Sequence, residues 1–311
     1  MRRKSENAML RHMKKVVYSK LPTEQNNPRS QKIDEVPVEE ILSIINREDQ
    51  SVPAAVAKVK KEIAAGVKII VGQLKSGGRI FFVGAGTSGR LGVLEAAECP
   101  PTFSTPPSLV QAVMAGGKKA VFRSQEGAED NREAALMIFR KKIRKNDVVI
   151  GIAASGVTPF VAGAFMAAKE KKAKTILVAC NDASPFKNLI DCLIAPKPGP
   201  EVITGSTRLK AGTATKLVLN MLTVASMIKM GKVYKNWMVD LQPKSKKLVA
   251  RGIRLVEMLG NVPANRAEDY FEKAHQNVKA AILMAQKDLD FSSASKLLRK
   301  NSGFLKKALE A

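Results

Sequence analysis

A glycine-rich turn with two adjacent hydroxyl groups offers the clearest chemistry in this sequence. The apolar run 80–83 leads into GAGTS at 84–88, which contains Thr87 and Ser88, and a helix-forming stretch follows. A strand, a tight glycine turn and a helix N-terminus together form an anion site, because backbone N–H groups and the positive end of the helix dipole converge on one point. The sequence therefore predicts that this turn binds a phosphate group.

The glycine spacing also fits a dinucleotide-binding turn, but the rest of that pattern is absent. Gly84, Gly86 and Gly89 satisfy G-x-G-x-x-G. A dinucleotide fold needs an acidic residue about 20 positions later to bind the ribose hydroxyls. No Asp or Glu lies between Glu98 and Glu126, so we do not expect NAD to bind here.

A second turn of the same kind follows the third predicted strand. In GIAASGVTPF at 151–160, Ser155, Gly156 and Thr158 come directly after the strand, and Pro159 suits the first position of a helix. Thr158 could be an ordinary helix N-cap, which is the preferred interpretation of one isolated turn. Two such turns at the carboxyl edge of one parallel sheet instead indicate a ligand site, because open α/β sheets bind ligands there.

Composition excludes several other kinds of site. The formal net charge of +24 is spread along 311 residues, and aromatic residues are scarce. We therefore interpret the charge as a solvated surface and expect no specific nucleic-acid partner. With only His12 and His275 in the chain, neither a Ser-His-Asp triad nor a histidine metal site fits the central region. Acid–base chemistry there falls to carboxylates, Lys, Tyr or Cys.

The sequence favours a cytoplasmic protein. No apolar run approaches the ~18 residues of a membrane span, and the basic N-terminus lacks the apolar segment of a secretory signal. Cys99, Cys180 and Cys192 sit in or beside apolar runs, which is typical of buried thiols in a reducing compartment. We therefore expect no membrane partner.

Strands and helices alternate through the central region and predict an α/β fold. The predicted strands are 80–84, 109–115, 147–152, 175–180 and 190–195, and the predicted helices among them are 88–98, 129–145, 158–172 and 208–231. Continuous apolar strands separated by helices indicate a parallel sheet covered on both faces, a three-layer αβα sandwich. Before it, we expect a helix at 38–46 and a long helix at 51–75, and Pro100 and Pro101 should end the helix 88–98.

The chain divides into three predicted regions. Residues 1–22 form a basic arm, expected to be disordered, and residues 23–242 form the α/β domain. The composition changes near Gln242-Pro243, and short amphipathic helices follow at 243–311.

Two levels of resemblance support this division. The two hydroxyl turns resemble the sugar-isomerase (SIS) domain, which binds phosphorylated sugars. The longer motifs within 23–242 resemble, in order, those of the N-acetylmuramic acid 6-phosphate etherase family. They are TEQNNP, IINREDQSVP, GAGTSGRLGVLEAAECPPTF, EGAEDNRE, DVVIGIAASGVTPFV, EVITGSTRLKAGTATKLVLNML and GKVYKNWMVD. The resemblance implies an SIS fold, a small three-helix (UBA-like) C-terminal domain at 243–311 and a homodimer.

The same resemblance implies a lyase of cell-wall amino-sugar recycling. Such an etherase cleaves the D-lactyl ether of N-acetylmuramic acid 6-phosphate to N-acetylglucosamine 6-phosphate and D-lactate. In the open-chain aldehyde the C2 proton is acidic, so its removal and protonation of the C3 oxygen would expel lactate before water adds back. This route needs one base and one acid, and we expect no metal and no organic cofactor.

The resemblance places two catalytic carboxylates at Glu98, in LEAAECPP, and Glu129, in EGAED. Glu98 is predicted in the last turn of its helix, where the dipole and any burial favour the protonated form, so we expect it to be the general acid. Glu129 is then the base at C2. Glu95 and Glu126 are expected to be solvent-facing or salt-bridged.

Two cations could complete the site. Arg208 and Lys210, which open the helix 208–231, could hold a carboxylate or phosphate or could equally form structural ion pairs. The expected ligands of the substrate phosphate are Thr87, Ser88, Ser155, Gly156 and Thr158.

The spacing of these residues raises a question of reach. At 1.5 Å per residue, Ser88 and Glu98 would lie about 15 Å apart along a straight helix, which is longer than a sugar phosphate. Either the phosphate binds only at the Ser155 turn, or two subunits of a homodimer share the site.

Three alternatives stay open. A phosphosugar isomerase of the same fold would remove the C2 proton without releasing lactate. A non-enzymatic regulator, similar to the glucokinase regulatory protein, would bind the phosphosugar and turn over nothing. A nucleic-acid-binding protein rests on the charge alone.

Overall fold

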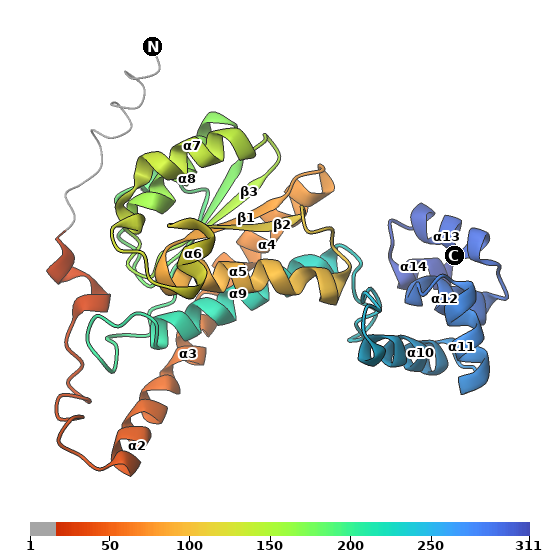
Figure 1. Ribbon diagram of the computed structural model, residues 1–311, viewed down its shortest axis with the longest axis horizontal. Coiled ribbons are helices and arrows are strands. Elements are labelled where there is room, and N and C mark those ends of the chain that lie inside the picture. Colours follow the sequence, from red (N-terminus) through yellow and green to blue (C-terminus); the bar gives the residue numbers. More distant parts are fainter. Residues whose placement is uncertain (1–16) are drawn as a thin grey trace. The chain divides into compact units, whose positions relative to one another are not determined.

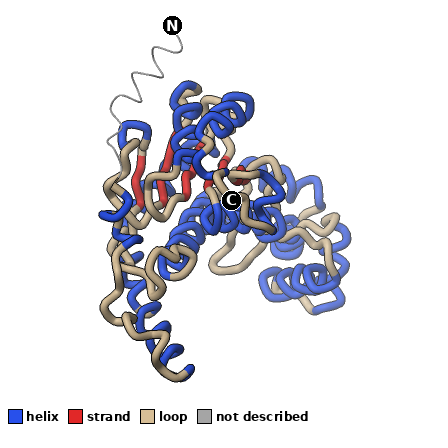
Figure 2. The backbone as a smooth tube through the Cα atoms, turned by 60° about the vertical axis from the view of Figure 1, so that its left-hand side comes forward, coloured by secondary structure: helices blue, strands red, loops and turns tan. Residues whose placement is uncertain are grey.

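The computed structural model describes residues 17–311, which form two compact units (Figures 1 and 2). Unit 1 contains the chain up to Ala96 together with Leu109–Leu222, and unit 2 contains Ala97–Ser108 and Thr223–Ala311. The change from one unit to the other falls within α5 (Gly86–Phe103) and α9 (Lys210–Lys229). The predicted domain boundary at 242–243 stays a prediction.

Most of the predicted basic arm, 1–22, lies outside the described residues. Its described end, from residue 17, forms the short 3-10 helices η1 (Tyr18–Lys20) and η2 (Pro22–Glu24).

Unit 1 is built on a parallel sheet of five strands in the order β2-β1-β3-β4-β5. All five predicted strands are confirmed within two residues at each end. They are β1 (Ile80–Gly84), β2 (Val110–Met114), β3 (Val148–Ile152), β4 (Lys174–Val178) and β5 (Cys192–Ile194). Every residue of β1 and β3 is buried, as continuous apolar strands require.

Helices cover both faces of this sheet (Figure 1). On one face, Phe81, Val149 and Leu177 share a core with the helices α7 (Arg132–Lys142) and α8 (Pro159–Glu170). On the other face, α4 (Lys60–Lys75) contacts β3, β4 and β5. The predicted three-layer αβα sandwich is therefore confirmed.

Two predicted helices have other boundaries. The helix expected at 51–75 is divided into α3 (Ser51–Ala57) and α4, and α2 (Val38–Asp49) precedes it. The helix expected to stop at Pro100 and Pro101 continues through both prolines to Phe103. Cys99 and Phe103 are buried in this extension, and their burial offsets the hydrogen bonds that the prolines cannot make.

Two short elements that the sequence patterns did not predict complete unit 1. They are α6 (Gly117–Phe122) and the 3-10 helix η4 (Lys187–Leu189). The helix predicted at 129–145 corresponds to α7, with the 3-10 helix η3 (Ala128–Asp130) just before it.

α9 departs from the expectation that no stretch approaches a membrane span in length. Its 20 residues have the length and the apolar composition of a span, but 56% of its most apolar window is buried in this structure. Core helices of folded domains have the same character.

Unit 2 is helical, as predicted, but its described residues form five helices after α9, where the resemblance implied three. They are α10 (Lys246–Gly260), α11 (Ala264–Lys273), α12 (Val278–Lys287), α13 (Phe291–Lys300) and α14 (Leu305–Glu310). These helices enclose an apolar core of their own, with Phe271 and Leu283 fully buried in it.

Candidate active site

The two hydroxyl turns lie side by side at the carboxyl edge of the sheet. Gly84, the last residue of β1, pairs with Ile152, the last residue of β3, so both turns leave the sheet at the same level. Each turn contains one glycine with left-handed backbone, Gly86 with φ +53° and Gly156 with φ +74°. The placement expected from the sequence is confirmed.

The first turn brings α5 very close to β1. A Cβ atom on Gly89 would lie 2.8 Å from the Gly84 carbonyl oxygen, so only glycine allows this approach. Thr87 and Ser88 are half-buried, and none of the side-chain hydrogen bonds found within residues 17–311 involves their hydroxyls. Both hydroxyls are therefore available to a ligand.

The second turn does not use its threonine as a helix cap. Thr158 occupies the N-cap position of α8, yet its side chain accepts no hydrogen bond from the helix. The Ser155 hydroxyl oxygen accepts one long bond, 3.4 Å, from the Val157 N–H. Ordinary capping chemistry therefore does not account for Thr158.

The loop after β4 holds the second turn from behind. The Asn181 Nδ2 group donates to the Ser155 carbonyl at 3.1 Å, and the Ser184 hydroxyl donates to the Gly156 carbonyl at 2.8 Å. Both supporting side chains are buried. The sequence reasoning missed them, although their position just after the TILVAC strand places them at the same sheet edge.

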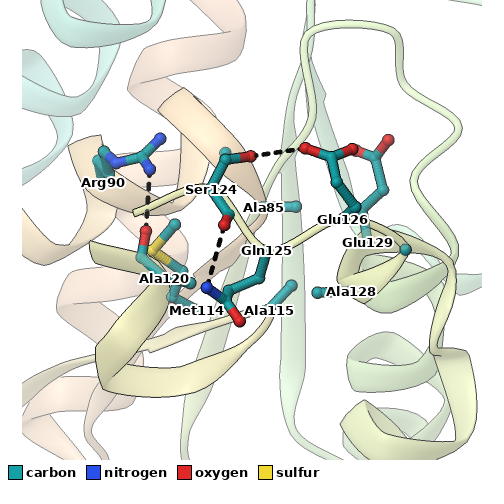
Figure 3. Close-up of a pocket in the computed structure, with 12 residues that line it drawn as sticks. Ala85, Arg90, Met114, Ala115, Ala120, Ser124, Gln125, Glu126, Ala128 and Glu129 are labelled. Carbon is teal, nitrogen blue, oxygen red and sulfur yellow. Dashed lines mark hydrogen bonds between the residues drawn. The ribbon is translucent and has the colours of Figure 1, made fainter. Parts of the chain in front are cut away.

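A pocket of about 130 Å³ opens beside the first turn (Figure 3). Glu129 lines it from η3, and Glu126 lines it as well, with its carboxylate accepting a hydrogen bond from Ser124 at 3.0 Å. The other lining residues are Ala85, Gly86, Arg90, Met114, Ala115, Ala120, Ser124, Gln125, Gly127 and Ala128. One predicted catalytic carboxylate thus lies at a pocket beside the predicted phosphate turn.

Glu98 has surroundings that differ from those expected. Because α5 continues to Phe103, Glu98 is not in the last turn of its helix, and its side chain is exposed in the single chain. It is not among the residues that line the pocket. Glu95 is buried and forms an ion pair with Lys216. Of the two expectations for Glu95, solvent-facing or salt-bridged, the second is therefore confirmed.

The two predicted cations have different positions. Arg208 is exposed, whereas Lys210 is fully buried, and its ammonium group lies 2.6 Å from a carboxylate oxygen of Glu48. Lys210 therefore forms the structural ion pair that the sequence left as an alternative.

Glu48, whose side chain is buried, is the centre of a polar cluster. Its carboxylate also accepts hydrogen bonds from Arg29 and from Asn27, the latter at 2.8 Å. Burial opposes ionisation of Glu48, but the hydrogen bonds from Arg29, Lys210 and Asn27 outweigh it and lower the pKa of Glu48 from 4.5 to about 2. The cluster joins three segments that are distant in the sequence.

Glu201 closes the N-terminus of α9. Its carboxylate accepts hydrogen bonds from the backbone N–H groups of Lys210 at 2.8 Å and Ala211 at 2.9 Å. Burial raises the pKa of Glu201 in spite of these bonds. An internal carboxylate therefore already occupies this helix end, which leaves the two hydroxyl turns as the candidate anion sites.

The three cysteines are poorly placed to act as nucleophiles. Cys99, Cys180 and Cys192 are free and buried, as predicted. Burial, with a smaller contribution from Glu201, raises the pKa of Cys180 to about 12, so its thiol stays protonated. Within residues 17–311, no group of three or more His, Cys, Asp or Glu side chains is placed to hold a metal ion.

Two family models match the α/β region. The model of the glucokinase regulatory protein N-terminal SIS domain matches residues 62–169, and the SIS domain model matches residues 129–225. A phosphoheptose isomerase of known structure from Neisseria gonorrhoeae is 20% identical, with a TM-score of 0.44, over 60% of this chain and 96% of its own length.

Similar curated proteins extend over nearly the whole chain. The N-acetylmuramic acid 6-phosphate etherase of Geobacillus thermodenitrificans is 47% identical over 93% of this chain and 99% of its own length. The protein of the same name from Mesorhizobium japonicum is 49% identical over 93% of this chain and 94% of its own length.

Proposed function

This chain belongs to the N-acetylmuramic acid 6-phosphate etherase family, and we propose that it cleaves the D-lactyl ether of N-acetylmuramic acid 6-phosphate. The products are N-acetylglucosamine 6-phosphate and D-lactate, and the reaction belongs to cell-wall amino-sugar recycling. Identity of 47% over 99% of a relative's length carries this proposal. The pocket that Glu129 lines beside the first hydroxyl turn supports it.

The reaction proceeds by elimination and then addition. Glu129 takes the C2 proton of the open-chain aldehyde, and the C3–oxygen bond breaks as Glu98 gives its proton to the lactyl oxygen. Water then adds at C3, and a proton returns to C2. Both carboxyl groups recover their starting protonation states, so the sum of the steps is hydrolysis of the ether without a metal or an organic cofactor.

The phosphate binds at the hydroxyl turns. Ser155, Gly156 and Thr158 contact it from the second turn, and Thr87 and Ser88 contact it from the first. The available hydroxyls of Thr87, Ser88 and Thr158 support this assignment. Arg208 binds an anionic group of the substrate, whereas the buried Lys210 stabilises the fold.

The active site is shared between two subunits of a homodimer, in the cytoplasm. Glu98 is exposed in the single chain and lies ten positions after Ser88 on α5, about 15 Å at 1.5 Å per residue. A second subunit would bury Glu98 and supply the phosphate turn and the base that act with it. Burial of this kind favours the protonated form that a general acid needs.

Incubation with N-acetylmuramic acid 6-phosphate and a D-lactate assay tests the function. We expect stoichiometric D-lactate and N-acetylglucosamine 6-phosphate, with no loss of rate after exhaustive chelation. An isomerase would convert phosphosugars without lactate. A non-enzymatic regulator would bind the substrate unchanged.

A further inference from the structure

We propose that Arg90 is a positioning residue that holds the segment carrying Glu129 against α5. This inference rests on the proposed function for its catalytic consequence, but its structural half can be tested without any activity. Arg90 lies on α5 just after the hydroxyls of Thr87 and Ser88, and its side chain is half-buried in the wall of the pocket.

The guanidinium of Arg90 closes the C-terminal end of α6. Its Nε donates to the Val121 carbonyl at 2.8 Å and its Nη2 donates to the Ala120 carbonyl at 2.9 Å (Figure 3 draws the second bond). The last carbonyls of a helix have no partners inside the helix, and they carry the negative end of its dipole. A forked cation is therefore well matched to this position.

The backbone around α6 needs such an anchor. The helix begins with two consecutive glycines in left-handed backbone, Gly116 at its N-cap with φ +79° and Gly117, its first residue, with φ +68°. The segment that leaves it is exposed through Glu126, and it turns at Gly127 with φ +70° before η3 presents Glu129. Glycine-rich, exposed backbone has little conformational preference of its own.

Arg90 connects both halves of the proposed site to one helix. The turn at the start of α5 fixes Thr87 and Ser88, and the Arg90 fork fixes the segment that leads to Glu129 on the same helix. A base must reach its proton within hydrogen-bonding distance, and a displacement of about 1 Å can cost about 10²-fold in rate. The fork therefore sets the position of the base relative to the bound sugar.

The test compares Arg90→Met, which keeps the apolar stem but removes both donors, with Arg90→Lys, which can donate to one carbonyl at a time. Arg140→Met is the matched control, because Arg140 also forms a two-bond fork, to Glu170, but joins α7 to α8. Amide hydrogen exchange is measured over 116–130 and over β1 and β3, and kcat, KM and C2 hydrogen exchange with heavy water are measured on the proposed substrate.

In Arg90→Met we expect amide exchange over 116–130 to accelerate about tenfold or more while β1 and β3 keep their protection. We expect kcat for lactate release and the C2 exchange rate to fall together by about 10²-fold, with KM within about threefold of the parent. For Arg90→Lys we expect exchange rates and kcat between those of the parent and of Arg90→Met. Arg140→Met should leave the amide exchange over 116–130 and kcat unchanged.

Three results would overturn the proposal. Unchanged amide protection of 116–130 in Arg90→Met would show that Arg90 does not anchor this segment. Loss of protection throughout the sheet would make Arg90 a general stabilising residue. Loss confined to 116–130 with unchanged kcat would leave an anchor without a role in positioning the base. If the parent protein released no lactate, the proposed function would fail, and the exchange pattern would still decide whether the anchor exists.

Discussion

At the scale of single residues, Thr158 is the most informative hydroxyl. A threonine at an N-cap position normally gains its stability from a side-chain bond to the helix, but Thr158 makes none. Thr158→Ala should therefore leave the unfolding free energy nearly unchanged and weaken binding of the phosphorylated substrate by about 1–3 kcal/mol, the value of a hydrogen bond to a charged group. Calorimetric binding and thermal melts on the same variant separate the two effects.

Ser155 provides the comparison for that measurement. Its hydroxyl accepts a weak bond from Val157, so Ser155→Ala should show the same loss of affinity, about 1–3 kcal/mol, with a small loss of stability. Unchanged affinity in both variants would contradict the assignment of the second turn to the phosphate.

The two catalytic carboxylates should be separable by isotope exchange. Glu98→Gln removes the acid and keeps the base, so it should lose lactate release by about 10²-fold or more and still exchange the C2 hydrogen with heavy water. Glu129→Gln should lose both. Mass spectrometry of recovered substrate measures the exchange, and the opposite pattern would reverse the two roles.

Substitution of Arg208 should affect substrate binding, whereas substitution of Lys210 should affect stability. Arg208→Ala should raise KM about tenfold, as expected for loss of a charge-assisted bond, without lowering Tm, because the side chain is exposed. Lys210→Met should lower the unfolding free energy by about 3–5 kcal/mol, because it leaves the buried Glu48 with one cation fewer. A lower Tm for Arg208→Ala would contradict the assignment of Arg208 to substrate binding alone.

At the scale of elements, the polar cluster around the buried Glu48 joins α2, the start of α9 and the segment before α2. Because the folded-state pKa of Glu48 is about 2, below its usual 4.5, ionised Glu48 stabilises the fold above pH 4.5, and this contribution is lost as the pH falls toward 2. Glu48→Gln should cost about 3–5 kcal/mol at pH 7, and the difference from the parent should narrow at pH 3.

Denaturant titrations at the two pH values measure this effect. The matched control is Glu35→Gln, whose exposed carboxylate lies 4.0 Å from Lys32 and should contribute less than about 1 kcal/mol at either pH. A constant difference between parent and Glu48→Gln from pH 7 to pH 3 would contradict the lowered pKa.

The elements also show what the sequence could predict. The five strands were predictable because a parallel sheet covered on both faces needs continuous apolar runs, and such runs have few alternatives. The end of α5 was not predictable from the sequence. Pro100 and Pro101 are a local signal for the end of a helix, but burial of Cys99 and Phe103, which depends on tertiary packing, outweighs it.

The same limit applies to the site. The turns could be placed at one edge because adjacent parallel strands end together. The ion pair of Lys210 with Glu48 joins residues 162 positions apart, and a Glu within a polar helix pattern gives no local sign of burial. The Arg90 fork was hidden for a similar reason, because its partners are backbone carbonyls of a helix that the sequence patterns did not predict.

At the scale of the whole molecule, the homodimer proposal concerns the distance between acid and base. Glu98 is exposed in the single chain, and Glu129 lines a pocket that does not include it. If a two-fold dimer builds each site from Glu98 of one subunit and Glu129 of the other, two inactive variants can complement each other. If each chain holds a complete site, they cannot.

Mixing Glu98→Gln and Glu129→Gln subunits therefore decides between these arrangements. In a shared site, each mixed dimer has one site with both carboxylates intact and one with neither. Half of the randomly reassociated dimers are mixed, so about a quarter of the parent lactate-release rate should return, although each variant alone is nearly inactive. Reassociation after denaturation, with tagged subunits to isolate mixed dimers, makes the measurement. Mixed dimers no more active than either variant would place acid and base in the same chain.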